Sequence, residues 1–250
     1  MKNNGAKVGV VVAPRYFDTT TKELAQIAPD VDILHTQIRV DADFGFSLEE
    51  IAQTGDEIEQ CALSLRDAGA EIVIQLGTPF STAHGWAGGN TLQQRIEDRI
   101  EIPFEMMGLS VPAAAIALGA KRIAMPTTYY NPEWVARYTE FATDAGLEVV
   151  ATESFVDQGV FETNEQAWAA SFVGFSPNVL ASTIGAIATN NPGVDCILMP
   201  GLPGRFLEHV STMEADVGVP VVSYFSIWWR CLNRLGIEPV GDCGTLMNLT

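Results

Sequence analysis

The chain has 250 residues, of which 47% are apolar and 18% are charged, and its formal net charge is −17 at pH 7. This composition can bury a large core and excludes wholesale disorder, and the length allows one large domain or two small ones. Because 31 Asp and Glu residues outnumber 14 Lys and Arg residues, we expect no nucleic-acid partner and no binding to an anionic membrane surface.

Short β-branched runs alternate with longer helical patterns along the chain. The expected strands are Lys7–Val12, Glu71–Leu76, Pro103–Met107, Lys121–Met125, Asp195–Met199 and Val219–Val222. The expected helices are one from the capping box of Ser47 and Glu50 to Leu65, Thr91–Ile100, Val111–Gly119, one opened by Asn131-Pro132-Glu133, one opened by Thr163 and Gln166, and Ile227–Gly236. Strands that alternate with helices predict an α/β fold with helices on both faces of a parallel sheet.

The chain also repeats itself. Pro103 and Pro220 each open a strand that is followed by a helix, and each of these segments ends at a glycine sixteen positions further on. We therefore expect two similar parallel-sheet α/β domains. The first would consist of residues 1–118 and 221–250, and the second, inserted into it, of residues 119–220.

The cysteines stand far apart, with no C-x-x-C pair, at Cys61, Cys196, Cys231 and Cys243. This spacing predicts structural thiols rather than a disulfide framework or a zinc site. The first residues lack the features of a signal peptide, and no apolar stretch reaches the roughly 18 residues that a membrane helix requires. We expect a cytoplasmic protein, either a monomer or a homo-oligomer.

Four loops are candidates for a binding site, because ligands of open parallel sheets bind beyond the carboxyl ends of the strands. These loops are Ala13–Tyr16, Gly77–Ser81, Pro126–Asn131 and Pro200–Gly204. They offer hydroxyls, backbone N–H groups and aromatic rings, but no lysine, no metal-binding cluster and no nucleotide-binding glycine motif. Such a set suits a small carboxylic acid held by neutral donors beside an apolar pocket.

A series of residues in a fixed order carries a family resemblance. It consists of Gly77-Thr78 after a buried strand, Gly85, Asn90, Pro103, Ala117-Leu118-Gly119, Arg122-Ile123-Ala124, Thr127 and Tyr129. In order and spacing this series resembles the arylmalonate decarboxylase and maleate isomerase family, within the aspartate/glutamate racemase superfamily. The resemblance implies two pseudo-symmetric α/β domains with the site in the cleft between them, and chemistry without a cofactor on a carbon next to a carboxylate.

The resemblance also implies roles for individual residues. In arylmalonate decarboxylase, hydroxyl and amide donors hold one carboxylate and stabilise the enediolate that CO₂ loss leaves, and a cysteine protonates this carbanion. Carried over, Thr78 and Tyr129 fall on donor positions and are the candidate catalytic residues, and Pro14 falls on the pocket wall. The other candidate substrate-binding residues lie in the same loops and are Gly77, Pro79, Phe80, Tyr130, Gly201 and Leu202.

The chain departs from the family pattern at three positions. Racemases and maleate isomerases of the superfamily carry one cysteine after each of two central strands. At the first position this chain has Gly77, as in arylmalonate decarboxylase, and at the second it has Gly201 or, in a register shifted by one, Pro200. Pro79 replaces a hydroxyl donor of the family and has no N–H to offer. Cys196 lies inside its strand, about 16 Å before the loop position, and cannot substitute.

These departures favour one of three candidate functions over the other two. Without the thiols, racemisation lacks an evident acid–base pair and maleate isomerisation lacks a nucleophile. A cofactor-independent lyase that decarboxylates a small substituted malonate-type or related carboxylic acid is therefore the favoured function. An isomerase or racemase with acid and base groups other than cysteine, and a carboxylate-binding protein without turnover, stay open as alternatives.

Several further side chains are candidates for the same site. The carbanion could take its proton from water, Tyr129, Tyr130 or His84, and a second carboxylate could be held by Arg15 or Arg39. The aromatic residues that could form a pocket wall are Phe80, Trp86, Phe225, Trp228 and Trp229.

Overall fold

The computed structural model describes residues 5–128, 132–171, 174–201 and 204–249. The chain divides into two compact units, the first comprising Met1–Ser110 and Ile227–Gly241 and the second Val111–Ser226 and Asp242–Thr250. Among the described residues, every helix is too short or too polar to cross a lipid bilayer.

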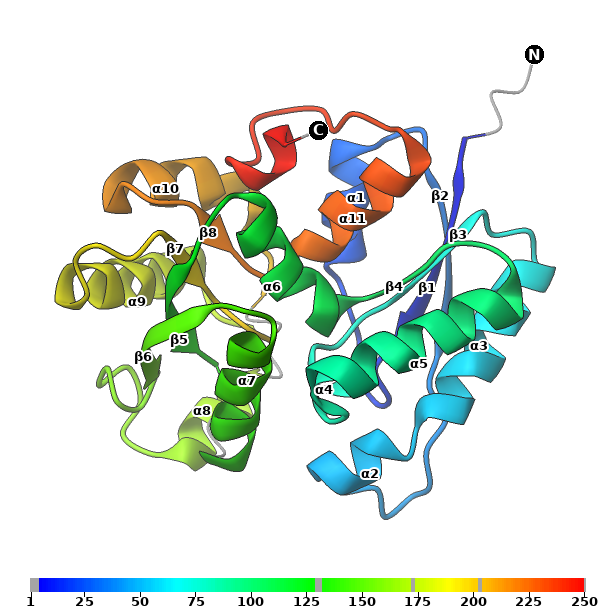
Figure 1. Ribbon diagram of the computed structural model, residues 1–250, viewed down its shortest axis with the longest axis horizontal. Helices are drawn as coiled ribbons and strands as arrows, with labels where there is room; N and C mark the ends of the chain where they lie inside the picture. The colour runs from blue at the N-terminus through cyan, green and yellow to red at the C-terminus, as the bar shows by residue number, and fades with distance from the viewer. Residues whose placement is uncertain (1–4, 129–131, 172–173, 202–203, 250) are drawn as a thin grey trace. The chain divides into compact units, whose positions relative to one another are not determined.

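Unit 1 is built on a four-stranded parallel sheet with the strand order β2-β1-β3-β4. Its elements in chain order are β1 (Lys7–Val12), α1 (Thr21–Ile27), β2 (Asp32–Gln37), α2 (Leu48–Ala52), α3 (Gly55–Asp67), β3 (Ile72–Gln75), α4 (Pro79–Thr82), α5 (Gly85–Ile100), β4 (Phe104–Met106), the start of α6 (Met107–Ala117) and most of α11 (Ser226–Leu235). Figure 1 shows α3 and α5 on one face of this sheet and α1 and α11 on the other. This cover explains the continuous apolar runs of the buried central strands β1 and β3.

Unit 2 is built on a second four-stranded parallel sheet, with the order β6-β5-β7-β8. Its elements are the rest of α6, then β5 (Arg122–Thr127), α7 (Pro132–Asp144), β6 (Glu148–Ser154), α8 (Asn164–Ser171), α9 (Pro177–Asn190), β7 (Cys196–Leu198), the 3-10 turn η1 (Leu207–His209), α10 (Val210–Val217), β8 (Val221–Val222) and the 3-10 turn η2 (Leu246–Asn248). Helix α7 packs on β6, α9 on β5 and α10 on β8. Figure 1 shows α9 and α10 side by side.

The two units repeat the same contacts. The two sheets have the same strand order, in which β1, β2, β3 and β4 correspond to β5, β6, β7 and β8. In unit 1, the N–H of Phe104 donates to Glu97, seven residues earlier, at 3.0 Å. In unit 2, the N–H of Val221 donates to Glu214, also seven residues earlier, at 3.0 Å. The structure thus confirms the expected pair of pseudo-symmetric parallel-sheet α/β domains.

The helix expected from Ser47 to Leu65 is wrong in one respect, because the structure has two helices there, α2 and α3. The capping box is present: Ser47 Oγ accepts from the N–H of Glu50 at 3.2 Å, and the Glu50 carboxylate accepts from the N–H of Ser47 at 2.9 Å. The helix breaks where Thr54 Oγ1 donates to the carbonyl of Ile51 at 2.7 Å. That bond satisfies one of the last carbonyls of α2 and lets the chain change direction.

A buried carboxylate ties α11 to the sheet of unit 1. Glu105 of β4 is 1% exposed, and its two oxygens accept from Nε of Arg230 at 3.0 Å and Nε of Arg234 at 2.8 Å. Arg234 also reaches Glu97 of α5 at 3.1 Å. The C-terminal helix is therefore held by charge-assisted hydrogen bonds to two elements of the same unit.

Replacing Glu105 with glutamine is expected to destabilise the protein by about 2 kcal/mol, because both arginines lose their buried anionic partner. The loss stays below the usual cost of breaking a fully buried pair, since the two arginine side chains are 35% and 39% exposed and solvent screens them. Urea unfolding measures the change. Glu140→Gln, in an exposed pair with Arg137, is the matched control and should shift stability by less than about 0.5 kcal/mol. Equal shifts in the two variants would contradict the assignment.

Candidate active site

The loop after β3 places donor groups at the carboxyl edge of the sheet of unit 1. Gly77 has a φ of 109°, and this turn leads directly into α4, whose N-cap residue is the fully buried Thr78. The carbonyl of Gly77 accepts from the N–H of Phe80 at 3.2 Å and from Nε2 of Gln75 at 3.3 Å. Because the peptide is planar and trans, the N–H of Thr78 points away from these two donors.

Three neighbouring groups fix the Thr78 turn, and the sequence does not reveal them. Thr82 Oγ1 and Ser81 Oγ donate to the carbonyl of Thr78 at 2.9 and 3.4 Å. Gly108, in the first turn of α6, lies so close that a Cβ there would be 2.5 Å from that carbonyl oxygen and 2.0 Å from Ser81 Oγ. The turn is thus clamped between its own hydroxyls and the backbone of α6.

Gly77 and Gly201, the candidate positions where racemases and maleate isomerases of the superfamily carry cysteines, both have a left-handed backbone conformation. A Cβ at Gly77 would lie 2.9 Å from the ring of Phe80 and 3.5 Å from Cβ of Ala13, and φ there is left-handed. Gly201, buried after β7, has a φ of 94°. Side chains at such φ values are strained, so each loop conformation favours glycine. The alternative register places Pro200 at the position, which likewise carries no thiol.

The loop after β1 lies beside the Thr78 turn, and the guanidinium of its Arg15 is engaged in hydrogen bonds to backbone carbonyls. Pro14 is buried, as a wall residue would be, and Arg15 has a left-handed φ of 55°. The Arg15 guanidinium donates to the carbonyl oxygens of Asp41 and Phe44, the second at 3.1 Å. Arg15 therefore fastens the segment after β2 to this loop, which argues against a role in holding a second carboxylate.

The surroundings of Arg39 also argue against a carboxylate ligand. This exposed residue lines a groove together with the acidic side chains of Asp41, Asp43, Glu50 and Glu57. Four carboxylates around one guanidinium repel a further anion.

In unit 2, hydroxyl groups donate hydrogen bonds to backbone carbonyls of the loops at the carboxyl edge of the sheet. Thr127 ends β5 and Thr128 follows it, and both are buried; Thr128 Oγ1 donates to the carbonyl of Pro200 at 3.5 Å. Ser223, directly after β8, donates from Oγ to the carbonyl of Met199 at 2.8 Å. The candidates Tyr129, Tyr130 and Leu202 lie outside the described residues.

His84 is placed as the N-cap residue of α5. Its Nε2 is buried and has no hydrogen-bond partner in the described part of the chain. Burial, and secondarily the positive charge of Arg95, lowers the pKa of His84 below its ordinary value. The neutral imidazole therefore dominates at pH 7, which makes His84 a weak acid for protonating a carbanion.

The aromatic candidates fall into two groups. Phe225, Trp228 and Trp229 are buried core residues. Phe80 is also buried, but its ring covers Gly77, and Trp86 is half-buried in the first turn of α5. Pro79 occupies the first position of α4, where its missing N–H costs nothing. Of these aromatic residues, only Phe80 and Trp86 lie on the segment that carries Thr78.

The thiols do not supply a nucleophile at the described strand ends. Cys196 and Cys231 are fully buried, and burial raises the pKa of both, that of Cys231 to about 12. Burial also raises the pKa of Cys61, whose Sγ lies 3.6 Å from the carbonyl of Gln37. Within the described ranges, no three His, Cys, Asp or Glu side chains form a group that could hold a metal ion.

Comparisons with known proteins bear on the family and the fold of the chain. A family model described as arylmalonate decarboxylase matches residues 23–246. A crystal structure of arylmalonate decarboxylase is 20% identical with a TM-score of 0.78, covering 98% of this chain and 100% of that one. The maleate isomerase Iso from Pseudomonas putida S16 is 21% identical with a TM-score of 0.80, covering 97% and 98%.

A mutant of the Nocardia farcinica maleate cis-trans isomerase, solved with a covalently bound succinylcysteine intermediate, is 17% identical with a TM-score of 0.72, covering 97% and 98%. Among curated proteins, none matches the sequence. Because the family model spans most of its length, the chain belongs to the arylmalonate decarboxylase family.

Proposed function

We propose that this protein is a cofactor-independent lyase that decarboxylates a small substituted malonate-type or related carboxylic acid. The observation that carries the proposal is the Thr78 turn, which sets neutral donors at the carboxyl edge of a parallel sheet. Membership of the arylmalonate decarboxylase family supports the reaction class.

The turn suits the difficult step of this reaction. One carboxylate of the substrate accepts hydrogen bonds from the hydroxyl and N–H of Thr78, and Tyr129 is the second candidate donor. The C–C bond to the other carboxyl group breaks, CO₂ leaves, and the electron pair moves into the bound carboxylate as an enediolate. Donors that already point at this developing charge stabilise the transition state without reorganising.

The remaining candidate contacts shape the pocket. Pro14, Gly77, Pro79 and Phe80 surround the turn with apolar and backbone surface, and Gly201 and Leu202 are the corresponding candidates of unit 2. Neutral donors have an advantage over an arginine here. A guanidinium would bind the dianionic substrate tightly before any bond breaks, whereas catalysis requires interactions that strengthen in the transition state.

An isomerase is the second candidate, because maleate isomerases match the fold as well as arylmalonate decarboxylase does. A relative with a succinylcysteine intermediate uses a thiol, and in this chain Gly77 and Gly201 stand at the two loop positions. Isomerisation here would have to proceed through other acid and base groups. The third possibility is a carboxylate-binding protein without turnover.

The proposal is tested by incubating the purified protein with a panel of alkyl- and aryl-substituted malonates while CO₂ release and pH are followed. We expect turnover of at least one of them. Maleate in the same panel tests the isomerase, since fumarate would form without CO₂. A malonate that raises the melting temperature but is recovered unchanged would favour the binding protein and overturn the lyase.

A further inference from the structure

The proposed decarboxylation leaves a carbanion that needs a proton, and the loop after β1 contains a carboxyl group that can hold one. Asp18 Oδ1 accepts from the N–H of Thr20 at 2.7 Å and from its Oγ1 at 2.6 Å. Asp18 Oδ2 is buried and has no hydrogen-bond partner among the described residues. A turn at this position needs only the first oxygen, so the second oxygen is unexplained by the local structure.

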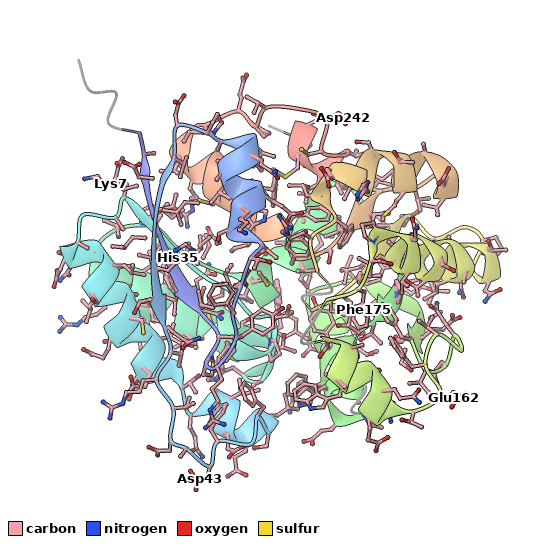
Figure 2. The ribbon with its side chains drawn as sticks, turned by 180° about the vertical axis from the view of Figure 1, so that it is seen from behind. Lys7, His35, Asp43, Glu162, Phe175 and Asp242 are labelled. Carbon is pink, nitrogen blue, oxygen red and sulfur yellow. The ribbon has the colours of Figure 1, made fainter. Side chains whose placement is uncertain are left out.

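The loop that carries Asp18 lies at the same edge of the sheet as the Thr78 turn. Strands β1 and β3 are parallel neighbours, and Ala13 Cβ is 3.5 Å from the point where a Cβ of Gly77 would lie. Gln37 holds the loop by donating from Nε2 to the carbonyls of Ala13 and Tyr16, both at 3.1 Å. Figure 2 shows this end of the strands, marked by Asp43, opposite the end marked by Lys7.

The environment of Asp18 favours its neutral form. Phe17 is 90% exposed, whereas the neighbouring Asp18 side chain is turned inward. Burial raises the pKa of Asp18, while its bonds from Thr20 and the charge of His35 on β2 oppose that rise. Tyr16 faces it from the same loop, and its own pKa is raised by burial and by Asp18. Oδ2 has no partner among the described residues in either state, and burying an unpaired charge costs more than burying a neutral hydroxyl, so burial favours the protonated form.

We propose that Asp18 protonates the enediolate, a role that rests on the proposed decarboxylase function. The O–H bond of the Asp18 carboxyl breaks, and its proton forms the new C–H bond at C2. The enediolate becomes the product carboxylate, and Asp18 becomes an aspartate that takes up a proton from water before the next turnover. This role fills the place that a cysteine holds in the pattern the family resemblance implies.

The test compares Asp18→Asn with a matched control. Asparagine keeps the shape and the bonds from Thr20 but holds no acidic proton. Asp157→Asn is the control, because Asp157 also accepts from a backbone N–H and a hydroxyl, those of Ser154, at 2.8 and 2.7 Å, but is exposed. The substrate is a malonate with two different groups at C2, so that the product is chiral.

The wild-type protein should give an excess of one enantiomer that falls as the pH rises through the raised pKa of Asp18. D18N should release CO₂ within about tenfold of the wild-type rate, since bond cleavage precedes protonation. Its product should be nearly racemic at every pH, because water protonates both faces. D157N should behave as wild type. An unchanged enantiomeric excess in D18N, or equal losses in both variants, would overturn the role.

A second measurement separates this inference from the proposed function. If the wild-type protein releases no CO₂ from any malonate, the decarboxylase proposal fails. The infrared difference spectrum between wild type and D18N then tests, without any turnover, whether Asp18 holds a proton at the ligand site. A carboxylic acid band that persists above the ordinary Asp pKa of about 3.9 and shifts when a malonate binds supports a proton-holding Asp18 at the ligand site. Absence of the band, or a band that ignores the ligand, overturns it.

Discussion

Replacing Thr78 with alanine is expected to lower kcat/KM for decarboxylation by about 10²–10³-fold, the usual cost of removing one donor that faces a developing negative charge. The hydroxyl is lost, while the Thr78 carbonyl that anchors Ser81 and Thr82 stays in place. The turn should therefore keep its shape. Steady-state kinetics on the malonate that turns over fastest measures the effect, and kcat should carry most of it.

Thr78→Ser is the matched control, because it keeps the hydroxyl and removes only a methyl group from a fully buried site. It should retain activity within about tenfold of wild type, with a loss of stability of about 1 kcal/mol. If alanine and serine reduce kcat/KM equally, the hydroxyl is not a donor and Thr78 serves the packing of the turn.

Gly108→Ala is expected to destabilise the protein by about 3 kcal/mol and to abolish most activity, because overpacking at this site cannot relax cheaply. The new methyl group would lie 2.5 Å from the Thr78 carbonyl oxygen and 2.0 Å from Ser81 Oγ. Either α6 or the Thr78 turn must move. Thermal unfolding and the decarboxylation assay together measure the two consequences.

Gly185→Ala provides the comparison, since Gly185 also lies inside a helix, α9, but has nothing within 4 Å of the point where its new methyl group would lie. Alanine there should leave activity unchanged and raise stability by up to about 1 kcal/mol through helix propensity. Similar stability changes in G108A and G185A would show that the close approach of α6 to the Thr78 turn does not matter.

The central strands and the edge strands β4 and β8 could be predicted from sequence, whereas the edge strands β2 and β6 could not. Strands β1 and β3 are covered on both faces, so their runs of Val and Ile are continuous and unmistakable. Strands β2 and β6 lie at the sheet edges, and most of their side chains are exposed or half-buried. A mixed polar pattern without a buried run gives no basis for expecting either strand.

The candidate site divides in the same way. The turn at Gly77 and Thr78 could be predicted, because a glycine directly after a buried strand indicates a tight turn at the edge where ligands of parallel sheets bind. Two features depend on contacts between residues far apart in the sequence, which no local pattern contains. They are the close approach of Gly108 to the Thr78 turn and the hydrogen bonds from Arg15 to the carbonyls of Asp41 and Phe44. Asp18 had a usable local feature, since an aspartate two residues before a helix-opening threonine is typical of a capping turn.

The pairing of Glu105 also bears on how the protein is made. Its two arginine partners follow it by 125 and 129 residues, so the carboxylate leaves the ribosome long before either guanidinium exists. At about 5–20 residues per second, several seconds pass in which the four strands of the first sheet exist without α11, while residues 111–226 of unit 2 are synthesised. Unit 1 therefore lacks the cover of α11 until most of unit 2 has been synthesised, and unit 2 receives its last segment, Asp242–Thr250, only after α11.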